Sequence, residues 1–222
     1  MMKILRRKIL LLLGLPKTLL FNFKYLPWRE AVKLPFTVSH RVWFLELSGT
    51  VSIRGEVRPG MIEIGFGEVG IFDQHRSRTI WQVSGTVEFK GDAHIGHGSK
   101  ISVAGKLVLG RNFTITAESS IVAAKEVLIG DDVLLAWDVL LMDTDFHQIL
   151  DSEGRRVNPD APVVICDRVW IGCRSLVLKG VRVADGVVVA AGSVVSKSVT
   201  LENSVIGGSQ ISVLRENISW KR

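Results

Sequence analysis

A histidine follows two carboxylates in the short segment Asp143-Thr144-Asp145-Phe146-His147. An imidazole, whose ordinary pKa lies near neutrality, can remove a proton from an attacking hydroxyl at neutral pH. A neighbouring carboxylate can hold the ring in one tautomer and leave the other nitrogen free, and Asp143 and Asp145 stand close enough in sequence for that role. We therefore interpret His147 as a candidate general base.

The segment lies where a six-residue repeat breaks. Aliphatic or aromatic residues recur at every sixth position from Val83 to Leu141, with two shifts of two residues, and again from Ile165 to Val195 without a fault. The intervening run is polar and contains prolines, so the register is lost there. Strict counting from Leu141 nevertheless puts His147 on the inward column, and a buried core histidine is the alternative interpretation.

A period of six fits neither a helix, whose apolar spacing mixes three and four, nor an ordinary strand, whose period is two. It fits a short strand followed by a turn, and three such units close a triangular coil that buries its apolar column by stacking on its neighbours. The sequence predicts an all-β fold, a parallel β-helix over residues 41–205. Its first coils, at 47–72, are looser; a connecting loop lies at 72–79 and a candidate active-site loop at 143–163. Residues 206–222 form a C-terminal cap, with a short helix expected from Val213 to Arg222.

The basic character of the chain is concentrated at its N-terminus. Residues 1–33 hold eight Lys or Arg and one acidic residue, whereas the remainder has a net charge of −1, which argues against a nucleic-acid-binding body. The apolar run Ile9–Leu15 is shorter than the roughly 20 residues of a membrane span and lacks the features of a signal peptide. Residues 1–40 are therefore interpreted as a basic amphipathic segment. It either contacts an anionic membrane surface peripherally through residues 1–33, or packs over one end of the domain or on a neighbouring subunit.

Cysteine and histidine spacing indicates no disulfide framework and no metal site. Cys166 and Cys173 are seven residues apart, which fits small buried hydrophobes in a reducing cytosol. A zinc site of the γ-carbonic-anhydrase kind needs three suitably spaced histidines, and only His94 and His97 are close in sequence. The remaining histidines are His40, His75 and His147.

Three stretches after the break occur in an order typical of one family: Val169-Trp170-Ile171-Gly172, Val177-Leu178-Lys179-Gly180-Val181, and Ala190-Ala191-Gly192-Ser193-Val194-Val195-Ser196-Lys197. Over about residues 83–215 the chain resembles the hexapeptide-repeat acyltransferases, especially the maltose, galactoside and surface-polysaccharide O-acetyltransferases. The resemblance implies a left-handed β-helix that assembles as a homotrimer. It also implies transfer of an acetyl group from acetyl-CoA to a hydroxyl, in clefts between neighbouring subunits.

The resemblance also assigns residues. The family's catalytic histidine falls at His147, between Ile129-Gly130-Asp131 and the Trp-Ile-Gly restart. Backbone N–H groups at Gly172 and Cys173 are expected to bind the tetrahedral oxyanion. Basic side chains suit the nucleotide phosphates of coenzyme A. The implied coenzyme A groove runs along the late coils at Gly172, Cys173, Ala191, Ser196, Lys197 and Arg215.

Two departures bear on the acceptor. The run Gly208-Ser209-Gln210-Ile211-Ser212 lacks the family's usual proline and second basic residue. Thr116 and Ala124 occupy the positions at which galactoside acetyltransferases bind their sugar with Asn and Asp. Specificity for galactosides is therefore not expected here. Trp137 either stacks on a sugar ring or packs at a trimer interface.

The function expected from these residues is O-acetylation of a sugar or surface-polysaccharide precursor, in the cytoplasm or on the inner face of the membrane, without nucleic acid or metal. An N-acetyltransferase acting on an amino sugar is one alternative, since an amine acceptor uses the same base and donor. A non-catalytic hexapeptide-repeat scaffold is another.

Overall fold

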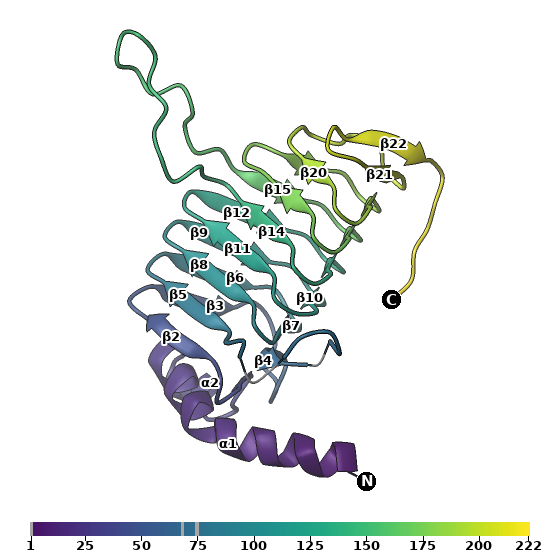
Figure 1. Cartoon of the computed structure of the whole chain (residues 1–222). Coiled ribbons are helices and arrows are strands. Elements are labelled where there is room, and N and C mark those ends of the chain that lie inside the picture. The colour runs from purple at the N-terminus through teal and green to yellow at the C-terminus, as the bar shows by residue number, and fades with distance from the viewer. Residues whose placement is uncertain (1, 68, 74–75) are drawn as a thin grey trace.

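The computed structural model describes residues 2–67, 69–73 and 76–222, with side chains from Leu5 onward. Three sheets wrap around one axis as the faces of a prism (Figure 1). Sheet A contains β1 (Phe36–Val38), β4 (Ile62–Phe66), β7 (Ala93–Gly96), β10 (Phe113–Ile115), β13 (Leu134–Leu135), β16 (Trp170–Ile171), β19 (Val188–Val189), β21 (Val205–Gly207) and β22 (Ser212–Arg215). Sheet B contains β2 (Trp43–Glu46), β5 (Ile80–Val83), β8 (Lys100–Val103), β11 (Ser120–Ala123), β14 (Leu140–Met142), β17 (Leu176–Val177) and β20 (Val194–Val195). Sheet C contains β3 (Thr50–Ile53), β6 (Thr86–Phe89), β9 (Lys106–Leu109), β12 (Glu126–Ile129), β15 (Val163–Ile165) and β18 (Arg182–Val183).

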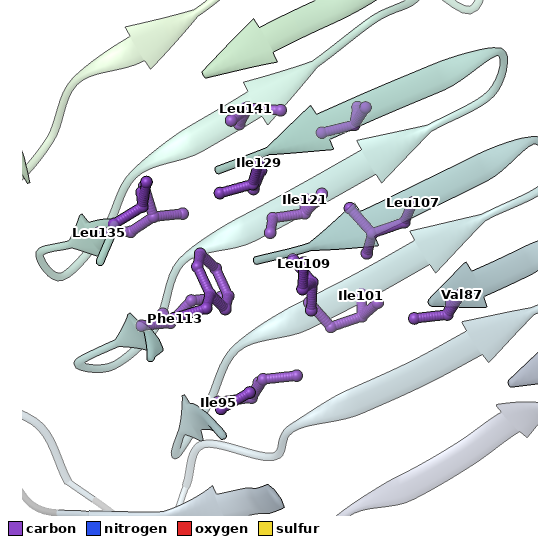
Figure 2. Close-up of a cluster of buried hydrophobic side chains, with 14 of the residues drawn as sticks. Val87, Ile95, Ile101, Leu107, Leu109, Phe113, Ile121, Ile129, Leu135 and Leu141 are labelled. Carbon is purple, nitrogen blue, oxygen red and sulfur yellow. The ribbon is translucent and has the colours of Figure 1, made fainter. Parts of the chain in front are cut away.

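The repeat produces stacked coils of two lengths. Ile95 pairs with Ile115 and Ile115 with Leu135, so these coils have 20 residues, whereas Ile171 pairs with Val189, which gives 18. The two extra residues of the early coils lie at the corner between sheets B and C, and they account for the two-residue shifts in the sequence repeat. Figure 2 shows the resulting columns of buried aliphatic side chains. The hexapeptide repeat and the parallel sheets together fit a left-handed β-helix.

The β-helix begins earlier than the sequence predicted. β1 starts at Phe36 and pairs in parallel with β4, so the first strand lies within the segment expected to precede the domain. The described residues from 67 to 79 contain no strand, and Gln74 and His75 of the predicted loop lie outside the described residues. The last parallel strand of the coils, β21, ends at Gly207.

Helix α1 (Met2–Tyr25), followed by the short α2 (Trp28–Ala31), lies across the N-terminal end of the β-helix (Figure 1). The Phe21 ring inserts among aromatic rings of the first coils, with its centroid 5.0 Å from that of Phe36 and 5.1 Å from that of Trp81. The Asn22 amide donates to the Phe36 carbonyl at 2.8 Å, and the Val38 N–H donates to the Thr18 hydroxyl at 2.9 Å. These bonds satisfy backbone groups of β1 at the open edge of sheet A.

Among the described residues, no helix has the length and apolarity needed to cross a bilayer. α1 meets the length requirement but interleaves its leucines with charged residues.

The predicted C-terminal helix is wrong. β22 pairs in antiparallel fashion with β21, and the chain then turns back along the coils. The Trp220 indole N–H donates to the Arg168 carbonyl at 2.7 Å, and the Arg222 guanidinium donates to the Asn112 side-chain oxygen at 3.0 Å. A strand forms because the β21 edge offers unpaired backbone groups and the apolar, β-branched residues near the turn suit pairing.

Between β14 and β15 the chain leaves the coils as a long arm, residues 143–162, that projects away from the body (Figure 1). In the preceding coil, the N–H groups of Ala104, Gly105 and Lys106 donate to carbonyls of the coil above. At the next level β14 and β15 continue the coil, but its corner is missing because the chain leaves there into the arm. Asp143, fully buried, replaces it: its two carboxylate oxygens accept the N–H groups of Ala124, Lys125 and Glu126 at 2.7, 2.8 and 2.6 Å.

Replacing Asp143 by Ala is expected to lower the free energy of unfolding by about 3 kcal/mol, because three buried N–H groups lose their acceptor. Denaturant unfolding measures the change. Asp92→Ala is the matched control, since the Asp92 carboxylate contacts the exposed Arg58 guanidinium at 2.8 Å and its loss should cost under about 1 kcal/mol. Equal effects of the two substitutions would contradict this account of the corner.

Candidate active site

His147 lies near the base of the arm, with an exposed side chain. Its backbone is fixed on both sides: its N–H donates to the Asp145 carbonyl at 2.6 Å, and its carbonyl accepts the Asn158 amide at 2.9 Å. Among the described residues, the imidazole itself takes part in no hydrogen bond or ion pair. The core-histidine interpretation is therefore wrong, because the chain leaves the inward register at Asp143.

Asp145 is held by two side chains from different parts of the chain. Its Oδ2 accepts the Asn158 amide at 2.7 Å and forms an ion pair with the Lys179 ammonium. Hydrogen bonds from Lys179, and then from Asn158, lower the pKa of the Asp145 carboxyl. A lowered pKa means that this anchoring is fully present above the ordinary carboxyl range and is lost only as the pH falls through the depressed value.

Asn158 organises the arm. It is 9% exposed, and besides its two donated bonds its side-chain oxygen accepts the Ile149 N–H at 2.6 Å. The Lys179 ammonium also donates to the Asn158 carbonyl at 3.0 Å. The Asn158 side chain thus joins the two strands of the arm, and its backbone carbonyl links the arm to Lys179 at the corner between β17 and β18.

A second group of contacts closes the arm at its base. The Asp160 carboxylate accepts the Thr144 hydroxyl at 2.8 Å and the Arg156 guanidinium at 2.7 Å. The hydrogen bond from Thr144 is the leading cause of the lowered pKa of the Asp160 carboxyl. The arm is therefore a hydrogen-bonded hairpin, and Asp145 and Asp160 both belong to its framework.

The two candidate carboxylates have partners other than the His147 ring. Asp143 binds the backbone of the preceding coil, and Asp145 binds Lys179 and Asn158. Within one subunit, neither carboxylate contributes to His147 the tautomer-fixing contact expected from the sequence. Both instead fix the segment that carries it.

The other predicted site residues occupy two different edges of the prism. At the edge between sheets A and B, the Arg174 N–H donates to the Trp137 carbonyl at 3.1 Å and the Gly192 N–H donates to the Cys173 carbonyl at 2.8 Å. Trp137, Cys173 and Ala191 therefore lie on successive coils of that edge. The arm lies on the opposite side of sheet B, at the edge with sheet C. Ser196 and Lys197, both exposed, follow β20 at this second edge.

Trp137 is thus close to His147 in sequence only. Sheet B separates their edges, and the indole is half-buried. A role for Trp137 beside His147 requires the edge of a neighbouring subunit.

The proposed oxyanion donors at Gly172 and Cys173 need a correction. The Gly172 N–H donates to the Val189 carbonyl at 2.8 Å and is committed to the coil. A Cβ at this position would meet the Ala191 nitrogen at 2.6 Å, so Gly172 is required by close stacking of the coils. Arg215, exposed, ends β22 at the far end of sheet A. Both cysteines are free and half-buried, and burial raises the pKa of the Cys166 thiol.

Sequence reasoning missed Lys179 and Asn158 as parts of the site. Lys179 belongs to a motif of the repeat, and Asn158 to the polar run of the arm. Their partners are 34 and 13 residues away from them, so only the fold brings them together. The sequence signal that could have revealed the pair was Lys179 in a turn of the coil that follows an arm carrying Asp143 and Asp145.

No group of three or more histidine, cysteine or carboxylate side chains suited to a metal ion occurs in the part of the chain that the structure describes. His94 instead faces the Glu63 carboxylate, with 3.2 Å between Nδ1 and Oε2. This hydrogen bond is the leading cause of the lowered pKa of Glu63.

Residues 162–197 match the family model described as bacterial transferase hexapeptide (six repeats). A 56-residue segment is 39% identical to 2,3,4,5-tetrahydropyridine-2,6-dicarboxylate N-acetyltransferase from Staphylococcus aureus (strain JH9), covering 25% of this chain and 23% of that relative. The chain thus spans about a quarter of the length of the curated relatives it matches.

Among solved structures, the polySia-specific acetyltransferase NeuO is similar with a TM-score of 0.55 and 28% identity, over 83% of this chain and 74% of that one. The polysialic acid O-acetyltransferase OatWY is similar with a TM-score of 0.47 and 23% identity, over 84% and 90%. These comparisons confirm that the chain resembles the hexapeptide-repeat acyltransferases.

Lys179→Met is expected to loosen the arm while leaving the coils intact, because it removes the cation that holds Asp145. Amide hydrogen exchange at fixed pH should become about fivefold faster in residues 145–160, with little change in the midpoint of thermal unfolding. Lys106→Met is the matched control, since it removes an ion pair with Glu126 of 3.2 Å on the body. Unchanged exchange in the arm of the Lys179 variant would show that Lys179 does not anchor it.

Proposed function

We propose that the protein is an acetyl-CoA-dependent O-acetyltransferase that modifies a hydroxyl of a saccharide, with His147 as general base. The observation that supports this most directly is the arm itself. It interrupts the coils once, fixes the backbone of His147 on both sides, and leaves the imidazole exposed. A side chain carried on a fixed backbone in this way is accessible to an incoming substrate rather than packed in the core.

In the proposed reaction, His147 removes the proton from the acceptor hydroxyl as its oxygen attacks the carbonyl carbon of the thioester. The C–O bond forms, and the carbonyl oxygen becomes an oxyanion in a tetrahedral intermediate. Collapse of the intermediate breaks the C–S bond, and the imidazolium returns its proton to the departing thiolate of coenzyme A. His147 ends the cycle neutral, as it began.

Asp145 and Asp143 act in this proposal as positioning residues. Asp145, together with Asn158 and Lys179, sets where His147 stands above the corner of sheets B and C. Asp143 keeps the coil beneath intact. The carboxylate or carbonyl that fixes the tautomer of His147 is then supplied by the acceptor or by a neighbouring subunit.

Coenzyme A is proposed to bind along the late coils at Cys173, Ala191, Ser196, Lys197 and Arg215. Because Cys173 and Ala191 line one edge and His147, Ser196 and Lys197 the other, a homotrimer offers a direct way to complete the site. The second edge of one subunit would face the first edge of its neighbour, with Trp137 beside the incoming sugar. Each trimer would hold three such clefts.

The acceptor class follows from the resemblance, and two relatives suggest its range. NeuO is a polySia-specific acetyltransferase, and the Staphylococcus aureus relative transfers acetyl to nitrogen. We favour a hydroxyl acceptor because the sequence motifs that follow the arm resemble those of the O-acetyltransferases. We place the reaction on a sugar or surface-polysaccharide precursor, in the cytoplasm or on the inner face of the membrane.

His147→Ala is expected to lower kcat by about 10²–10⁴-fold, the usual contribution of a general base, with the Kd for coenzyme A little changed. The measurement is release of free thiol from acetyl-CoA over a panel of sialylated, neutral and amino sugars. Gln148→Ala is the control, because this neighbouring side chain is also exposed on the arm. Near-normal turnover by the His147 variant would exclude it as the base, and turnover with amino sugars alone would favour the N-acetyltransferase alternative.

A further inference from the structure

Helix α1 exposes an apolar face to the outside of the molecule. By helical periodicity its outward residues between Leu5 and Phe23 form a single stripe. Leu12 is 70% exposed, and Phe23, near the other end of the stripe, is 52% exposed. The stripe consists of Leu5, Ile9, Leu12, Leu13, Pro16, Leu19, Leu20 and Phe23.

The apolar residues of α1 face outward because its inner face makes polar and close backbone contacts with the first coil. Thr18 and Asn22 hydrogen-bond to the backbone of β1, and Gly14 lies against the Val38 carbonyl, where a Cβ has no room. Lys17 also turns inward and donates to the His40 carbonyl at 2.7 Å. The small and polar residues of α1 therefore cover the edge of sheet A, and the leucines face outward.

Basic residues border the stripe. Lys8 lies on one side of it and Arg6 and Lys24 on the other, by helical position. On α2, Trp28 is 68% exposed and is followed by the exposed Arg29. The surface thus combines leucines, an interfacial tryptophan and cations.

A cationic cavity of about 420 Å³ adjoins the same end of the molecule. It is lined by Lys17, His40, Arg41, Val42, Trp43 and Arg78, with no carboxylate among them. Burial, together with the nearby Arg78, lowers the pKa of Lys17, and burial with Arg41 and Lys17 lowers that of His40. An anion in the cavity would relieve this mutual repulsion.

We propose that this face of α1, with the adjoining cationic cavity, docks the protein on an anionic lipid bilayer, the leucines entering the interface and the cavity taking a lipid phosphate. A second copy of the chain fits less well, since residues 1–33 carry eight basic residues and one acidic residue and two such surfaces repel. An interfacial helix with an apolar face and flanking cations suits such a membrane.

The number of coils between α1 and the arm sets the distance from the membrane at which the reaction would occur. The arm leaves the coils after β14, which is separated from β2 by β5, β8 and β11 in sheet B. At the usual spacing of about 4.8 Å between strands, β14 lies roughly 20 Å from β2, and α1, about 10 Å across, lies beyond β2. A bilayer-anchored acceptor would therefore present a hydroxyl several sugar units from its anchor.

The test is flotation of the purified full-length protein with vesicles of phosphatidylcholine alone or with 30% phosphatidylglycerol (roughly the charge density of an anionic leaflet). The wild-type protein is expected to float with the anionic vesicles and to be released by salt. The double variant Leu12→Ser/Leu20→Ser should lower the partition coefficient at least about tenfold. Arg78→Ala should lower it about fivefold on anionic vesicles alone.

Leu214→Ser is the control, because Leu214 is 59% exposed at the opposite end of the molecule and should not affect flotation. Light scattering of the wild-type and double-variant proteins accompanies each experiment. Absence of wild-type flotation, equal binding to neutral and anionic vesicles, or a smaller oligomer in the double variant would overturn the proposal. The last outcome would assign this face to contact between copies.

Discussion

The whole structure depends on continuous pairing of each coil's backbone with the next, and the arm is possible only because Asp143 preserves that pairing. A coil that departs from the stack leaves the N–H groups of its neighbour without acceptors, at a cost of about 1–3 kcal/mol for each buried donor. The Asp143 carboxylate accepts three of them at once. The scaffold can therefore remain regular on both sides of an excursion of 20 residues, from 143 to 162.

The coils were predictable from the sequence because the inward column repeats with a period that neither a helix nor a simple strand has. The two-residue shifts also had a structural meaning, the longer corner of the early coils. Two features were not predictable, for one shared reason. Each depends on unpaired backbone groups at a sheet edge, and that edge exists only once the coils have formed. Thr18 and Asn22 of α1 cover the open edge of β1, and the residues from Ser212 to Arg215 pair with β21 instead of forming a helix.

The position of His147 was predictable from the broken repeat, but its surroundings were not. The nearby aspartates suggested a carboxylate that orients the His147 ring. In the structure Asp143 instead accepts backbone N–H groups of the coil, and Asp145 binds Lys179 and Asn158. Sequence proximity also placed Trp137 beside the loop, although sheet B lies between them. In a prism, residues ten apart occupy different edges, so local sequence is a poor guide to which side chains share a site.

We propose that the site is assembled from the two edges of neighbouring subunits. Co-assembly of His147→Ala subunits with Ala191→Trp subunits, whose added indole blocks the other edge, tests this most directly. Each variant alone should be nearly inactive, and an equal mixture should recover roughly a quarter of the wild-type activity by random assortment in a closed oligomer. If each subunit held a complete site, the mixture would stay as inactive as the separate variants, and the account would be contradicted.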